Sequence, residues 1–161
     1  SATFGQIVSV LMRTPQHRYA FLSDLEWLVL PAVATGQFSL AEAQDKASGL
    51  SAPVAVAVWA SVSEAVDHRL SSVPQQPLRL KPEEWNSGPI AWLVEAAGDP
   101  RAANALLKTV VEKRFAATGL KTFVRGADGK PVVRILRAED LAKAVTDGGG
   151  AAGSADGTRT G

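Results

Sequence analysis

Residues 52–63, APVAVAVWASVS, constrain the fold more than any other part of the sequence, because nearly every position is apolar. In a strand, successive side chains point to opposite faces of the sheet. Both alternating sets are apolar here, Val54, Val56 and Val58 on one face and Ala55, Ala57 and Trp59 on the other. Such a strand lies inside a sheet with helices on both faces. The sequence therefore predicts a layered α/β or α+β fold.

Apolar spacing and turn residues predict the remaining elements. Pro15 disfavours a helical Thr14 and predicts a turn at 14–18, whereas Gly36 ends the following helix. Asp99 and Pro100 are typical of a helix start. We expect helices at 4–13, 19–33, 63–70, 101–115 and 138–146, and strands at 37–44, 52–63, 90–97, 120–126 and 130–136.

The length of 161 residues suits one domain, expected at residues 1–146, followed by a disordered glycine-rich tail at 147–161. Gly148, Gly150 and Gly153 in this tail match a dinucleotide-binding pattern. That pattern requires a preceding strand and a following helix, and the tail predicts neither. We interpret the match as accidental.

Composition excludes several chemistries. The absence of cysteine rules out disulfides, thiolate metal sites and a cysteine nucleophile, and two histidines 51 positions apart lack metal-ligand spacing, so no metal is expected. No apolar run approaches the roughly 20 residues of a membrane span. Because residues 1–5 lack the features of a secretory signal, we expect a cytoplasmic protein. A G-x-S-x-G motif, typical of serine hydrolases, is absent.

Charge is distributed unevenly, although the net charge is only +1. Residues 101–137 carry nine basic and two acidic side chains, a local charge of +7, so the rest of the chain carries −6. This segment is either a solvated surface or a docking surface for an anionic partner. Nucleic acid is disfavoured, because Phe115 and Phe123 are the only aromatic residues in the segment and no binding motif accompanies them.

Two side chains could carry catalysis. His17 follows Pro15 and is either a polar turn residue or a general base. Glu95 interrupts the apolar strand pattern at 90–97, where an unpaired carboxylate would be costly, so it either reaches water or pairs with a base such as His17. The four tryptophans indicate core positions, although Trp85, beside an irregular turn, could wall a pocket.

An ordered set of short motifs resembles the toxin-activating lysine acyltransferases, the hemolysin-activating enzymes of RTX toxin systems. The resemblance extends from about Phe4 to Leu136 and lies in the order and spacing of the motifs. The motifs are Thr14-Pro15-Gln16-His17-Arg18, Leu28-Val29-Leu30-Pro31-Ala32, Pro53-Val54-Ala55 with Val58-Trp59-Ala60, and Glu84-Trp85-Asn86-Ser87-Gly88 with Trp92.

This resemblance implies a GNAT-like fold with a central, mostly antiparallel sheet, and fatty acyl transfer from acyl carrier protein to internal lysines of an RTX-type protoxin. It implies that His17 is the catalytic base and that Glu95 stands where the family usually has an aspartate. No bound cofactor is expected, since the phosphopantetheine thioester of the carrier would be a co-substrate. A homodimer is a further implication. Candidate contacts to substrate or carrier are Arg18, Trp85, Lys113, Arg114, Lys121 and Arg125.

The chain departs from the family pattern at several positions. Leu28 replaces a functional asparagine, Pro89 replaces an acidic residue, and Glu95 lengthens the expected carboxylate arm. An alternative function follows from these departures, in which a GNAT-like module docks the carrier or the toxin without acylating it.

Overall fold

The computed structural model describes residues 2–13, 22–72 and 78–141, and for residues 22–26 it describes the backbone alone. His17, Arg18, the turn expected at 14–18 and the tail expected at 147–161 lie outside the described residues. The helix expected at 138–146 begins at Ala138 and is described as far as Leu141.

The described residues form a five-stranded sheet in which the spatial order of the strands is β1-β2-β3-β4-β5. Neighbouring strands are antiparallel except β3 and β4, which are parallel. This mixed, mostly antiparallel sheet confirms the expected GNAT-like α/β fold. The strands are β1 (Phe38–Gln44), β2 (Ser51–Val62), β3 (Ile90–Gly98), β4 (Leu120–Arg125) and β5 (Pro131–Leu136).

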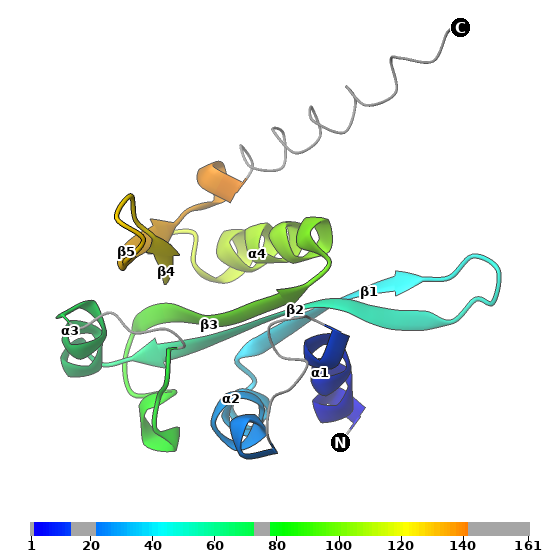
Figure 1. Cartoon of the computed structure of the whole chain (residues 1–161), viewed down its shortest axis with the longest axis horizontal. Helices are drawn as coiled ribbons and strands as arrows, with labels where there is room; N and C mark the ends of the chain where they lie inside the picture. The colour runs from blue at the N-terminus through cyan, green and yellow to red at the C-terminus, as the bar shows by residue number, and fades with distance from the viewer. Residues whose placement is uncertain (1, 14–21, 73–77, 142–161) are drawn as a thin grey trace, which may run out of the picture.

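Helices cover both faces of this sheet (Figure 1). Helices α1 and α2 lie on one face, and α4 lies on the opposite face. Helix α3 and the 3-10 helix η2 belong to the connection between β2 and β3. The bounds are α1 (Ala2–Arg13), α2 (Leu22–Thr35), α3 (Glu64–Ser72), η2 (Pro82–Glu84) and α4 (Pro100–Arg114).

Strand β2 is buried on both faces, as its composition predicts. Val56, Val58, Ala60 and Val62 belong to the core cluster beneath α1 and α2, which also contains Leu28 and Trp92. Ala55, Ala57 and Trp59 face the other way, into a second cluster with Leu106, Leu107 and Val110 of α4. The sheet therefore separates two apolar layers, and β2 contributes to both.

The junction between β3 and α4 depends on a glycine and an aspartate. Gly98 has a φ of +112°, and a Cβ at this position would lie 2.1 Å from the Val54 carbonyl oxygen. Both conditions favour glycine. Asp99 caps α4, because its Oδ2 accepts a hydrogen bond of 2.9 Å from the Ala102 N–H. This cap explains why the helix starts at Pro100, one residue before its predicted start.

Candidate functional site

The interior strand β3 departs from a regular ladder close to its only acidic residue. Val58 is paired with Glu95, whereas Trp59 is paired with Leu93, so that Val94 is an extra residue in a β-bulge. A bulge redirects the side chains near it and is common beside active sites. The sequence predicts the strand and does not predict its bulge.

Glu95 is half-buried at this bulge. Its register partner Val58 belongs to the core beneath α1 and α2. Paired residues of antiparallel strands share a face, so the Glu95 side chain lies on the α1 and α2 side of the sheet. Its Oε1 accepts a hydrogen bond of 3.1 Å from the Ala96 N–H. The carboxylate therefore lies on the face that α1 and α2 cover.

Strands β3 and β4 are joined by a single ladder pair, Trp92 with Lys121. We call this junction the fork. Asp67 of α3 closes it, because its Oδ1 accepts hydrogen bonds from Trp92 Nε1 at 2.9 Å and from Lys121 Nζ at 2.8 Å. The Lys121 ammonium also lies 5.9 Å from the centre of the Trp92 ring. Three elements therefore meet through one carboxylate.

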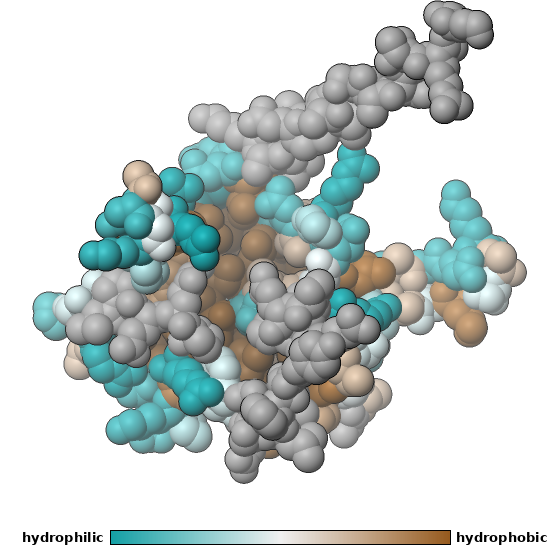
Figure 2. All heavy atoms as spheres, viewed as in Figure 1, coloured by the Kyte–Doolittle hydropathy of each residue, from teal (hydrophilic) through white to brown (hydrophobic). Residues whose placement is uncertain are grey.

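The fork changes the interpretation of Lys121. The sequence suggests that Lys121 contacts a carrier protein. In the structure, the Lys121 ammonium forms an ion pair with Asp67, and both side chains are partly buried. The other described basic candidates, Lys113, Arg114 and Arg125, are exposed. Figure 2 shows hydrophilic side chains gathered over the region of β4 and β5. These three side chains are therefore exposed enough to contact a partner protein.

Trp85 lies in the core and not at the surface. Its side chain is 0% exposed, and its Nε1 has no hydrogen-bond partner among the described residues. Beside it, Glu84 accepts hydrogen bonds from both terminal nitrogens of Arg69, at 2.5 and 2.9 Å. A contact between Trp85 and a substrate stays a prediction.

The Arg69 and Glu84 pair fixes η2 to α3. The hydrogen bonds from Arg69 hold the pKa of Glu84 below its ordinary value, and the Lys81 N–H adds to the effect. The same contact raises the pKa of Arg69. This pair is structural, since it orders the connection that leads into β3.

The structure also places two of the departures from the family pattern. Leu28 is 4% exposed and packs in the core beneath α2, so an apolar side chain fits its surroundings. Pro89 is exposed immediately before β3. Neither position offers a polar group to the site.

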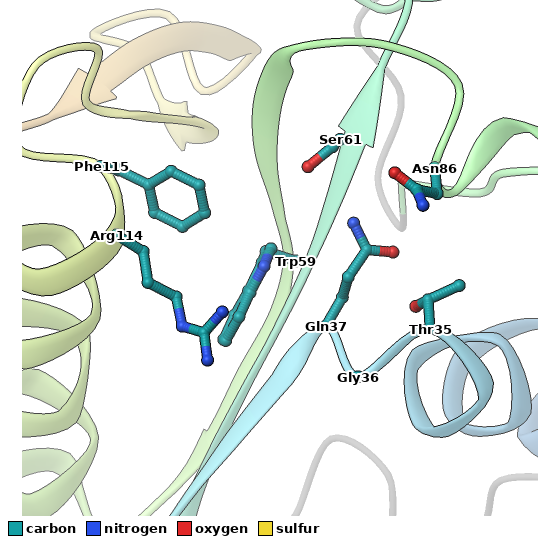
Figure 3. A pocket seen from close by; sticks show the side chains of 8 residues that line it. All are labelled: Thr35, Gly36, Gln37, Trp59, Ser61, Asn86, Arg114 and Phe115. Atoms are coloured by element: carbon teal, nitrogen blue, oxygen red, sulfur yellow. The ribbon is translucent and has the colours of Figure 1, made fainter.

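A cleft of about 380 Å³ opens on the α4 side of the sheet, near the start of β1. We call it the Gln37 cleft. Gln37 is 8% exposed, and its Oε1 has no hydrogen-bond partner among the described residues. The Arg114 guanidinium lies 5.3 Å from the centre of the Trp59 ring (Figure 3). The lining residues are Thr35, Gly36, Gln37, Trp59, Ser61, Asn86, Arg114 and Phe115.

Sequence reasoning missed the roles of Asp67 and Gln37. The partners of Asp67 lie 25 and 54 positions away in the chain, so no local pattern connects them. Gln37 has the pattern of an ordinary residue at the start of a strand. Its burial depends on how distant segments pack, because Trp59, Ser61 and Asn86 line the same cleft.

A mostly antiparallel sheet with helices on both faces, a fork between two parallel strands and a carboxylate at a bulge define a protein of the GNAT-like α/β class. A comparison with protein-family models gives a finer assignment, because the model of the RTX toxin acyltransferase family matches residues 1–139. The chain belongs to this family, which confirms the resemblance of its motifs and makes it an acyltransferase of the toxin-activating kind. A search of curated proteins gave no match. Within the described residues, no helix has the length and hydropathy needed to cross a membrane.

Proposed function

We propose that this chain transfers a fatty acyl group directly from acyl carrier protein to internal lysines of an RTX-type protoxin. In this proposal His17 is the general base and Glu95 is its carboxylate partner. The observation that supports it best is the position of Glu95, half-buried on an interior strand beside a bulge. The segment that contains His17 connects α1 to α2, and both helices lie on the face that Glu95 shares.

The reaction requires a base because a lysine with an ordinary pKa near 10.4 is mostly protonated at neutral pH. His17 would accept the proton, and the free amine would attack the thioester carbonyl carbon. As the tetrahedral intermediate collapses, the C–N bond remains and the C–S bond breaks. The thiolate of phosphopantetheine leaves and takes up the second proton, which the nitrogen loses as it becomes an amide, and His17 releases the first proton to solvent. Glu95 would orient the imidazole and stabilise its protonated form.

The oxyanion of that intermediate needs hydrogen-bond donors. Backbone N–H groups near the bulge at Val94 are our candidates, because the ladder between β2 and β3 is irregular there. Since the chain has no cysteine, a thioester relay through the protein is excluded, which favours direct transfer. No resident cofactor takes part in this scheme.

Acyl carrier proteins are acidic, so the exposed side chains of Lys113, Arg114 and Arg125 would provide the dock. Arg18 would assist from the same segment as His17. A cytoplasmic location and a homodimer complete the proposal.

Mass spectrometry of a protoxin fragment tests it directly. The fragment is incubated with the protein and with carrier protein loaded with a fatty acid, and the mass gain on lysine is followed over time. We expect His17→Ala to lower the rate by about a hundred- to ten-thousand-fold, the usual effect of removing a general base. His68→Ala is the matched control, because the exposed His68 lies on α3 outside the proposed site.

Undiminished acylation by His17→Ala would refute the assigned base. A wild-type protein that binds the carrier or the fragment without any mass gain would favour the rival function of a non-catalytic docking module. The buried Leu28, at a position where the family pattern implies an asparagine, is the observation that supports this rival.

A further inference from the structure

The Gln37 cleft lies apart from the fork and from Glu95. It adjoins β1 and the α4 face of β2, whereas the fork lies beyond β3 and Glu95 faces α1 and α2. The acyl transfer proposed above uses no group inside this cleft apart from the Arg114 guanidinium. The features of the cleft therefore need a separate explanation.

Gln37 is held rigidly while its side-chain carbonyl lacks a partner. Its backbone N–H donates to the Ala32 carbonyl at 3.0 Å, and its own carbonyl accepts from the Trp59 N–H at 3.1 Å. Figure 3 shows the side-chain amide directed into the cleft, between Ser61 and Asn86. A buried acceptor without a donor destabilises the free protein, so a ligand that supplies a donor would be favoured.

Arg114 offers the complementary group. Its guanidinium is stacked on Trp59, which is itself in edge contact with Phe115 at a centroid distance of 5.9 Å. No carboxylate of the described chain forms an ion pair with Arg114. The planar set of N–H donors on a stacked guanidinium is well suited to bind a carboxylate or a phosphate.

We propose that the Gln37 cleft binds a small organic anion that carries an N–H group. The anionic group pairs with Arg114, the N–H donates to Gln37 Oε1, and the rings of Trp59 and Phe115 contact the apolar part of the ligand. The cleft volume of about 380 Å³ is at the small end of ligand sites. The chemistry of the cleft is common to carboxylates and phosphates, and the test separates them.

Two matched pairs of probes provide the test, by NMR titration of the ¹⁵N-labelled full chain. N-acetylglycine carries an N–H that acetate lacks, and O-phosphoethanolamine carries an N–H that methyl phosphate lacks. We expect saturable shifts of the Trp59 and Ser61 amide signals, with at least tenfold tighter binding of the N–H probe in one pair. The pair that responds identifies the anion. Equal binding of both members in both pairs, or no binding, would overturn the proposal.

Three variants locate the interaction. Arg114→Ala should abolish the shifts, and Lys113→Ala, its exposed neighbour on the same helix, should retain them. Gln37→Leu should bind the N–H probe at least tenfold more weakly, while its melting temperature without ligand equals or exceeds that of the wild type. A lower melting temperature for Gln37→Leu would show that the amide serves the fold, and unchanged binding in Arg114→Ala would show that the shifts arise elsewhere. Either result would contradict the proposal.

Discussion

The Glu84 carboxylate connects the stability of this protein to acid pH. Hydrogen bonds from Arg69 hold its pKa below the ordinary value of 4.5. A lowered folded-state pKa stabilises the protein above the unfolded value, and this contribution is lost as the pH falls through the folded pKa. We expect Glu84→Gln to lower the free energy of unfolding by about 1–2 kcal/mol at pH 7. Urea unfolding should show this deficit shrinking below pH 4.5.

Glu83→Gln is the matched control, because Glu83 is exposed one residue away. The urea unfolding curve of Glu83→Gln should follow that of the wild type at pH 7 and at pH 3.5. A Glu84→Gln deficit that stays constant from pH 7 to pH 3.5 would show that the carboxylate charge contributes nothing.

At the residue scale, the sequence identifies an unusual side chain when that side chain differs in polarity from its neighbours in the chain. Glu95 is conspicuous because the residues around it are apolar, and the structure places it half-buried on an interior strand. Asp67 sits on a polar helix, where a carboxylate is unremarkable. Its contacts with Trp92 and Lys121 require the sheet to bring distant segments together, and no pattern along the chain encodes this arrangement.

The junction between β3 and α4 depends on Gly98. An alanine there would be strained at a φ of +112° and would also collide with the Val54 carbonyl of β2. We expect Gly98→Ala to lower the free energy of unfolding by about 2 kcal/mol or more, because the strain and the overpacking add. Thermal or chemical denaturation measures the change.

Gly129→Ala separates the two causes. Gly129 has a φ of +80° and open space around it, so an alanine meets backbone strain alone. Its cost should be about 1 kcal/mol. Equal costs for the two variants would mean that the contact with Val54 relaxes without penalty.

At the element scale, the sequence predicts a helix or strand well when the burial of its faces determines which positions are apolar. Strand β2 is recognisable because both its faces are apolar, and α4 because its cap and apolar stripe are local. The bulge at Val94 and the single pair that joins β3 to β4 arise from the fit between strands. A bulge adds one residue to a ladder without altering the apolar pattern enough to reveal it.

At the scale of the whole molecule, charge is distributed unevenly, with a local charge of +7 over residues 101–137. If this region docks an acidic carrier protein, affinity should fall several-fold between 50 and 500 mM salt, because salt screens exposed charges. We expect Arg125→Glu to weaken binding about tenfold at low salt and to flatten the salt dependence. Calorimetry or surface plasmon resonance with acyl carrier protein provides the measurement.

Lys46→Glu is the control for this prediction. It makes the same change in net charge at an exposed position between β1 and β2, outside the basic segment. If Lys46→Glu and Arg125→Glu weaken binding equally, net charge governs the association and the basic segment is not a dock.

The strands occupy the sheet in the order in which they occur in the chain. Each strand can therefore pair as soon as it is synthesised, because its neighbour has already left the ribosome. The longest gap to close is the 27-residue connection between β2 and β3, and the entropy of closing a loop rises only slowly with its length. No strand has to wait for the two ends of the chain to meet. The sheet can grow from β1 to β5 during translation, which limits the time that its apolar interior strands remain exposed.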